Sequence, residues 1–120
     1  MRNTSTRVIN YLRRRGHIAQ SVEKWIPVKG NWKKGKRIDL FGIIDIIAIV
    51  DNRLVGIQTF SGSITTHMAK IKESLYLNPW LATGTRFELW SWSKKNGLSK
   101  DGRKIKMWVP RIIEIGNGQA

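Results

Sequence analysis

Two aspartates lie inside the most apolar stretch of this 120-residue sequence. Asp39 and Asp45 belong to residues 38–50, where every other residue is apolar or glycine. An ionised carboxylate in a buried strand is strongly destabilising unless a partner compensates its charge. The chain has 22 Lys and Arg against 8 Asp and Glu, a formal net charge of +14, which suits a polyanionic partner. A divalent cation is the natural compensating ligand in such a protein, so the pair predicts a metal-dependent enzyme that acts on nucleic acid.

Gln58 and Glu23 supply further oxygen ligands. Gln58 lies on the strand expected beside that of Asp45, and Glu23 lies on the first expected strand. Oxygen atoms on neighbouring strands can hold one hard cation between them, and such a cation lowers the pKa of a bound water. The candidate ligands of Mg²⁺, which Mn²⁺ can replace, are therefore Asp45, Asp39, Gln58 and Glu23. Two plain alternatives stay open: a hydrogen-bonded buried amide for Gln58, and a surface ion pair with Lys24 for Glu23.

Basic clusters are the expected contacts to nucleic acid. The candidates for phosphate contact are Arg13, Arg14, Arg15, Lys29, Lys33, Lys34, Lys36 and Arg37. Trp32, among these lysines, is a candidate for stacking on an unpaired base. Ser61 and Ser63 precede an expected helix, where they either present backbone N–H groups to a phosphate or simply cap the helix.

Composition restricts the remaining functions. The sequence contains no cysteine, which removes disulfides, Cys-ligated zinc and thiol catalysis and fits a reducing cytosol. The start lacks the apolar segment of a signal peptide, and no apolar run approaches the roughly 20 residues of a membrane-spanning helix. We therefore expect a cytoplasmic protein without a membrane partner, in the host cytoplasm if a phage encodes it.

The chain is expected to form one domain over residues 1–120, with 1–6 and 116–120 frayed. Hydrophobic periodicity predicts a helix, three strands, a helix and two strands. The expected helices and strands are helix 7–15, strands 17–25, 37–50 and 54–60, helix 64–77, and strands 86–93 and 104–115. Residues 26–36 are expected to be a loop, 51–53 a tight turn, and 94–104 a polar turn. This order predicts an α/β fold with a mixed central sheet flanked by helices.

This arrangement resembles the PD-(D/E)xK nuclease superfamily. Residues 44–48, Ile-Asp-Ile-Ile-Ala, resemble its Pro-Asp-apolar motif, and residues 56–60, Gly-Ile-Gln-Thr-Phe, resemble its apolar-Glu-x-Lys motif. Gln in place of Glu is also found in Mrr-like branches. Within the superfamily, the sequence most resembles small phage and archaeal nucleases, including Holliday-junction resolvases. The resemblance covers residues 7–93. It implies a restriction-endonuclease-like core, Mg²⁺-dependent cutting of branched DNA in recombination, and a homodimer that cuts two symmetric strands.

Phe60 stands where the superfamily carries a lysine that orients or activates the attacking water. In some branches this lysine comes from the following helix, which makes Lys70 and Lys72 the candidates. A helical wheel favours Lys72, which borders the apolar stripe, whereas similar phage proteins more regularly have the lysine before Ile71. An ordinary phosphate contact is the alternative for both.

Two hypotheses follow. The first is a metal-dependent DNA endonuclease with catalytic Asp45, Gln58 and either Lys70 or Lys72. The second is a non-catalytic DNA-binding protein on a degenerate nuclease fold, which Phe60 and Gln58 favour. A basic RNA-binding module, the third class considered, leaves the buried aspartates unexplained.

Overall fold

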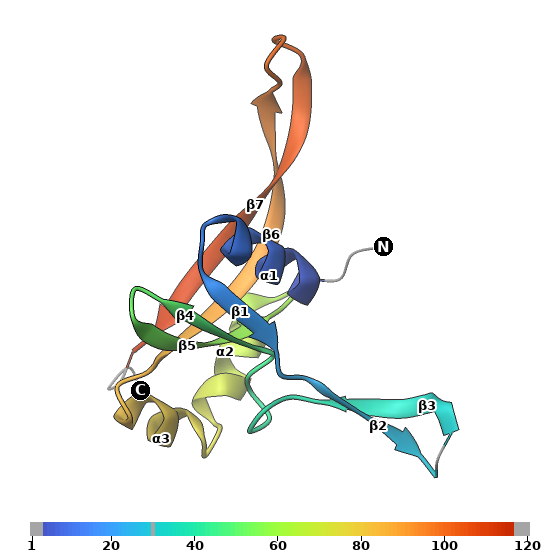
Figure 1. The fold of residues 1–120 in the computed structure, drawn as a ribbon, viewed down its shortest axis with the longest axis vertical. Coiled ribbons are helices and arrows are strands. Elements are labelled where there is room, and N and C mark those ends of the chain that lie inside the picture. The colour runs from blue at the N-terminus through green and yellow to red at the C-terminus, as the bar shows by residue number, and fades with distance from the viewer. Residues whose placement is uncertain (1–3, 30, 117–120) are drawn as a thin grey trace.

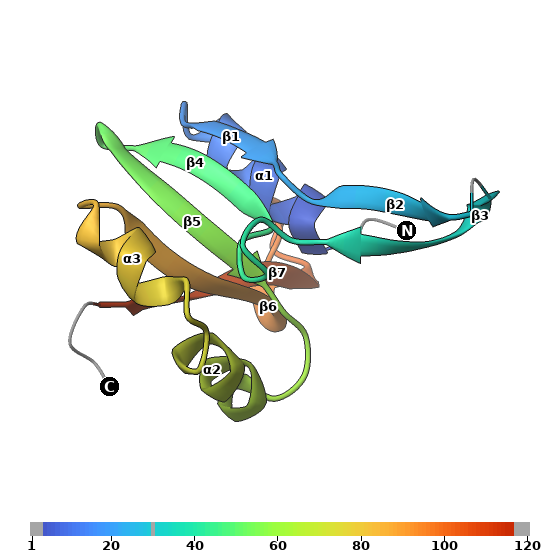
Figure 2. The same ribbon diagram turned by 90° about the horizontal axis from the view of Figure 1, so that it is seen from below.

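A five-stranded mixed β-sheet lies at the centre of the protein, with helices on both of its faces (Figures 1 and 2). The computed structural model describes residues 4–29 and 31–116, apart from the side chains of Val28, Asn31, Trp32 and Arg37. The elements in chain order are α1 (Thr4–Arg14), β1 (Ile18–Ser21), β2 (Lys24–Val28), β3 (Asn31–Ile38), β4 (Ile46–Val50), β5 (Arg53–Thr59), α2 (Ile64–Lys72), α3 (Leu77–Ala82), β6 (Arg86–Leu98) and β7 (Lys104–Ile115). The expected mixed α/β class is thereby confirmed.

The sheet has the strand order β1-β4-β5-β6-β7. Strands β1, β4 and β5 pair in antiparallel fashion, β5 and β6 are parallel, and β6 and β7 are antiparallel. A parallel pair needs a crossover connection, and the segment with α2 and α3 provides it. No helix in the described part of the chain is long and apolar enough to cross a bilayer.

Two hydrophobic clusters cover the two faces of the sheet. On the α1 face, the buried residues are Val8, Leu12, Ala19, Ile46, Ala48, Val55, Ile57 and Trp90. On the α2 face, they are Ile43, Ile44, Phe60, Ile71, Leu77, Leu81, Phe87, Leu89 and Ile115. Side chains in a strand alternate between faces, so β6 contributes Phe87 and Leu89 to one cluster and Trp90 to the other. The helices α1 and α2 therefore lie on opposite sides of the sheet (Figure 2).

Residues 26–36 form most of an antiparallel hairpin, not the expected loop. Strands β2 and β3 pair from Lys24↔Ile38 to Val28↔Asn31, and the hairpin extends away from the sheet (Figure 2). A Cβ on Gly35 would lie 2.7 Å from the Trp25 ring, so this glycine allows close approach of the ring. The prediction failed because the many lysines leave no alternation of apolar and polar residues. Backbone hydrogen bonds between β2 and β3 form this hairpin, and most of its side chains are exposed.

Three element boundaries also differ from the prediction. Helix α1 begins at Thr4, three residues before the expected start at Arg7. The helix expected over 64–77 ends at Lys72, and a second helix begins at Leu77, with Pro79 in its first turn instead of ending a helix. A first turn tolerates proline because its N–H groups have no intrahelical partner.

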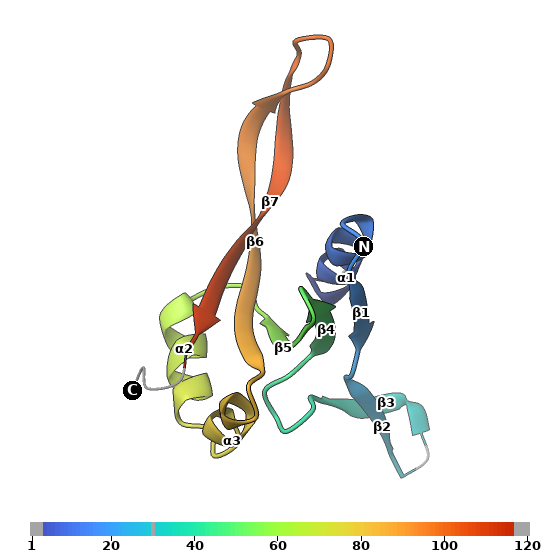
Figure 3. The same ribbon diagram turned by 60° about the vertical axis from the view of Figure 1, so that its left-hand side comes forward.

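The last two strands form a long arm. Strand β6 continues to Leu98, five residues past its expected end at Ser93, and pairs with β7 from Phe87 to Leu98. The outer part, residues 94–108, extends beyond the helices (Figures 1 and 3). We call this part the β6–β7 arm.

Candidate metal centre

Asp39 and Asp45 are brought together by a chain reversal. Leu40 and Ile44 exchange two backbone hydrogen bonds of 2.9 and 3.0 Å, and the chain turns back between them through positive φ angles at Phe41 and Gly42. The two aspartates are the residues immediately outside this pair. The expected strand 37–50 is interrupted here, because β3 ends at Ile38 and β4 begins only at Ile46.

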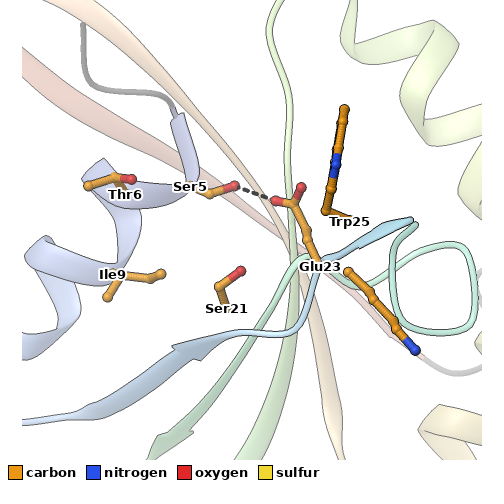
Figure 4. Close-up of a pocket in the computed structure, with 7 residues that line it drawn as sticks. Ser5, Thr6, Ile9, Ser21, Glu23 and Trp25 are labelled. Carbon is orange, nitrogen blue, oxygen red and sulfur yellow. Dashed lines mark hydrogen bonds between the residues drawn. The ribbon is translucent and has the colours of Figure 1, made fainter. Parts of the chain in front are cut away.

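Glu23 joins the two aspartates. It lies in the link between β1 and β2 and not on a strand as expected. One carboxylate oxygen from each of Glu23, Asp39 and Asp45 lies within 4.8 Å of the others. Oε1 of Glu23 accepts a 3.0 Å hydrogen bond from the hydroxyl of Ser5 on α1 (Figure 4). This three-carboxylate cluster therefore joins the β1–β2 link, the Asp39–Asp45 turn and the first turn of α1.

The end of β5 holds Asp45 in place. Asp45 is 6% exposed, and its Oδ2 accepts hydrogen bonds from the backbone N–H of Thr59 at 2.9 Å and from the Thr59 hydroxyl at 3.1 Å. The Thr59 and Ser5 hydroxyl oxygens lie 3.2 Å apart. Neither residue was predicted. Thr59 occupies the variable position of the motif and Ser5 lies in the segment expected to fray, so only their contacts reveal them.

Asp45 has a strongly perturbed acidity. Burial, above all, raises the pKa of its carboxyl to about 7. The hydrogen bond with Asp39 and the negative charges of Asp39 and Glu23 raise this pKa further, whereas the backbone N–H of Thr59 lowers it. Without a cation, the Asp45 carboxyl therefore begins to bind a proton near neutral pH.

The donor set fits a hard divalent cation. All three ligand atoms are carboxylate oxygens, which Mg²⁺ and Mn²⁺ prefer. Two oxygens on opposite sides of Mg²⁺ lie about 4.2 Å apart, since each Mg–O distance is about 2.1 Å. The three carboxylate oxygens lie within 4.8 Å of one another, slightly farther apart than this. Small side-chain rotations would bring them to Mg²⁺ coordination distance. Glu23, Asp39 and Asp45 are the residues that could hold the ion.

Gln58 supports the turn that carries the aspartates. Its side chain is buried, and its Nε2 donates a 3.3 Å hydrogen bond to the carbonyl of Ile43. Its Oε1 is also buried and has no hydrogen-bond partner among the described residues. The amide nitrogen is therefore hydrogen-bonded, as expected for a buried structural amide. The amide oxygen is still a candidate metal ligand.

The structure does not bring the predicted lysines to the carboxylates. Phe60 is buried, with its ring centroid 5.1 Å from that of His67. Lys70 and Lys72 are exposed on α2, and neither of the grooves that they line contains Glu23, Asp39 or Asp45. The groove of Lys70 is also lined by residues 41–43 of the Asp39–Asp45 turn, whereas that of Lys72 is lined by α2 alone. The expectation that one of them completes the site has no support in these contacts.

An open pocket of about 290 Å³ adjoins the cluster at Glu23 (Figure 4). Its lining residues are Ser5, Thr6, Ile9, Ser21, Glu23, Lys24 and Trp25. Lys24 is the only cationic residue among them, and Trp25 is 40% exposed. We had considered Lys24 only as an ion-pair partner for Glu23; its place in this pocket depends on the link between β1 and β2.

The predicted phosphate-contacting residues lie in three separate places. Lys29, Lys33, Lys34 and Lys36 are exposed on the β2–β3 hairpin. The side chains of Trp32 and Arg37, on the same hairpin, lie outside the described residues.

The second group, Arg13, Arg14 and Arg15, is exposed at the end of α1. Two of these arginines contact their own fold, because Arg13 donates to the carbonyl of Ala19 and Arg15 lies 3.7 Å over the Tyr11 ring. The third place precedes α2. There Ser63 accepts a hydrogen bond from the N–H of Thr66, as a helix cap does, and Ser61 is exposed.

Comparison with protein-family models, curated proteins and solved structures finds no match to this chain. The fold and the site together describe a mixed α/β protein with a three-carboxylate cluster at one end of its sheet.

Proposed function

We propose that this protein is a Mg²⁺-dependent endodeoxyribonuclease that hydrolyses phosphodiester bonds in DNA. The observation that carries the proposal is the convergence of Glu23, Asp39 and Asp45 in a chain of net charge +14. Close carboxylates repel one another, so a bound cation would stabilise this arrangement. A metal-dependent phosphodiesterase needs both features, a cation site and a surface that attracts polyanions.

Each member of the site has a distinct task in this proposal. When bound, Mg²⁺ polarises the phosphate and lowers the pKa of a coordinated water. Asp45, Asp39 and Glu23 would hold the ion, and Asp45 would lose its proton on binding it. Thr59 orients the Asp45 carboxylate through two hydrogen bonds, and Ser5 orients Glu23. Water attacks phosphorus as the bond to the leaving sugar oxygen breaks, and that oxygen takes up a proton.

Lys24 is the better candidate for stabilising charge on the phosphate than Lys70 or Lys72. It lines the pocket that contains Glu23, whereas the other two lysines lie on the helix that covers the opposite face of the sheet. A cation near the developing negative charge lowers the barrier of phosphoryl transfer. In this reading Phe60 has no chemical role and packs in the core of the α2 face.

Branched DNA and a homodimer remain part of the proposal through the resemblance to PD-(D/E)xK nucleases. The order of one helix, three antiparallel strands and a crossover to a parallel strand supports a restriction-endonuclease-like core, if the β2–β3 hairpin is taken as an insertion. A dimer would present two cleavage sites to a symmetric junction. Sedimentation of the protein with and without a four-way junction tests this assembly.

The competing function is DNA binding without cleavage on the same fold. Two observations favour it: the usual lysine position holds the buried Phe60, and the Gln58 amide donates to a backbone carbonyl. Both functions predict DNA binding, so only turnover separates them.

The decisive experiment incubates labelled four-way junction, linear duplex and single-stranded DNA with Mg²⁺, Mn²⁺ or EDTA. We expect cutting in Mg²⁺ and Mn²⁺, fastest on the junction, and none in EDTA. Asp45→Asn is the matched inactive control, since it preserves shape and removes one ligand charge. Tight binding of all substrates without cutting in either metal would establish the competing function.

A further inference from the structure

The β6–β7 arm is strongly basic. Between Lys94 and Trp108 it carries six Lys and Arg residues and a single acid, Asp101. Asp101 already pairs with Arg103 at 3.1 Å. The remaining cations are Lys94, Lys95, Lys100, Lys104 and Lys106, all of them exposed. An arm with this charge, projecting from the body into solvent, is suited to a polyanion and not to burial within the same chain.

The strand register sorts the arm into two faces. Directly opposed residues of an antiparallel pair share a face. Lys94 pairs with Trp108 and Leu98 pairs with Lys104, with Lys106 between them opposite Asn96. These positions form one face, which we call the lysine face. The opposite face carries Lys95, Ile105 and Met107. Contacts agree, because Lys94 Nζ lies 5.0 Å from the centre of the Trp108 ring.

The lysine face leads back to the carboxylate cluster. Arg7 of α1 stacks over Trp108, with Cζ 4.3 Å from the ring centre. Ser5, two residues earlier on the same helix, hydrogen-bonds to Glu23. The first turn of α1 thus connects the base of the arm to the cluster. A polyanion lying on the lysine face would continue over Arg7 toward the carboxylates.

We propose that the lysine face of the β6–β7 arm binds the backbone of double-stranded DNA beside the cleavage position. This inference rests on the proposed function, since it takes DNA as the substrate. A two-stranded β-ribbon fits the major groove of a duplex. Strand residues rise about 3.4 Å each, so the segment from Lys94 to Leu98 is roughly 14 Å long. Lys94, Lys104 and Lys106 then contact successive phosphates along a duplex flank of about four base pairs.

Fluorescence anisotropy with a labelled linear duplex in EDTA tests the arm without cleavage. The test variant is Lys94→Ala/Lys104→Ala/Lys106→Ala. The control variant Lys95→Ala/Lys100→Ala/Arg111→Ala also removes three cations, from the tip and the opposite face. We expect the test variant to lose about tenfold or more in duplex affinity, and its log K against log salt slope to become shallower by about 2 to 3. The control should lose clearly less.

Two results would overturn the inference: equal affinity losses in both triple variants, or a test variant that binds duplex as the wild type does. A loss on single-stranded DNA as large as on duplex would overturn the assignment of duplex. Matching circular dichroism spectra, and the milder Lys→Gln triple at the same positions, exclude misfolding as the cause. Failure of the nuclease proposal is distinguishable from failure of this inference. A wild-type protein that binds duplex through the lysine face but does not cut DNA would overturn the nuclease activity and leave the binding role of the arm in place.

Discussion

The carboxylates of Asp39 and Asp45 meet across a five-residue reversal, one position outside the hydrogen-bonded pair of Leu40 and Ile44. Asp45 is buried and Asp39 is half-buried, so their two negative charges cannot be neutralised by water. Either a proton or a cation must compensate them, and the two compete. This competition makes the stability and the metal affinity of the protein depend on pH in a defined direction.

The first prediction concerns stability without metal. The folded-state pKa of Asp45, about 7, lies above its ordinary value of 3.8. The folded state therefore binds more protons between these values, and the free energy of unfolding falls as pH rises from about 4 to 7. Asp45→Asn should remove this fall and stabilise the protein at pH 8 by up to about 4 kcal/mol. Urea unfolding in EDTA at pH 5 and pH 8 measures it, with Asp51→Asn in the exposed β4–β5 turn as control. A wild type equally stable at both pH values would refute the prediction.

The second prediction concerns metal binding. Mg²⁺ or Mn²⁺ should raise the thermal midpoint of the wild type, more at pH 8 than at pH 6, because protons leave Asp45 as the ion binds. Saturation at about 100-fold above Kd corresponds to about 2.7 kcal/mol. Asp45→Asn and Glu23→Gln should weaken the response, whereas Glu73→Gln, an exposed acid outside the cluster, should not. A wild-type midpoint that ignores both ions at pH 8 would argue against the metal site.

The third prediction tests Gln58. The Gln58→Glu variant loses the hydrogen bond that Nε2 donates to Ile43 and buries a carboxylate against that carbonyl. Without metal we expect a destabilisation of about 1–3 kcal/mol. If the oxygen of residue 58 ligates the ion, Mg²⁺ should restore most of this loss; the Gln58→Met variant, which has no such oxygen, should show no comparable recovery. Equal responses of both variants to Mg²⁺ would limit Gln58 to supporting the turn.

The fourth prediction separates positioning from binding at Thr59. Thr59→Val keeps the backbone N–H bond to Asp45 and removes the hydroxyl bond. Cleavage should slow by roughly tenfold, the size of one lost hydrogen bond to a charged group, with unchanged duplex affinity in EDTA. Thr59→Ser retains the hydroxyl and should cut at close to the wild-type rate. Wild-type cleavage by the valine variant would remove Thr59 from the mechanism.

The fifth prediction compares three lysines. Lys24→Ala should reduce cleavage by roughly 10²-fold, the scale of one lost electrostatic contact in the transition state. Lys70→Ala and Lys72→Ala should each cost less than about tenfold, since both lie on the helix across the sheet. Single-turnover cleavage with saturating DNA measures all three. A large loss in either α2 variant, with Lys24→Ala active, would restore the earlier hypothesis of a lysine supplied by that helix.

Local pattern alone was enough for much of the fold. The strand at 104–115 was predicted with its observed bounds, and the tight turn lies at Asp51 and Asn52, which adopt positive φ as such turns require. Arg53, expected in the turn, already belongs to β5. The apolar run around Asp45 likewise indicated its burial, which the structure confirms at 6% exposure. These features depend on residues close together in sequence, where periodicity reports which side of an element is buried.

The assembly of the site depended on tertiary contacts. Glu23 reaches the aspartates only because β1 pairs with β4. The Asp39–Asp45 contact requires a reversal within a run that has the composition of one continuous strand. Lys70 and Lys72 were placed correctly on a helix, yet the face of the sheet that this helix covers is set by the crossover between β5 and β6. Sequence periodicity defines the buried side of each element, whereas chain reversals and strand pairing decide which elements meet and which side chains share a site.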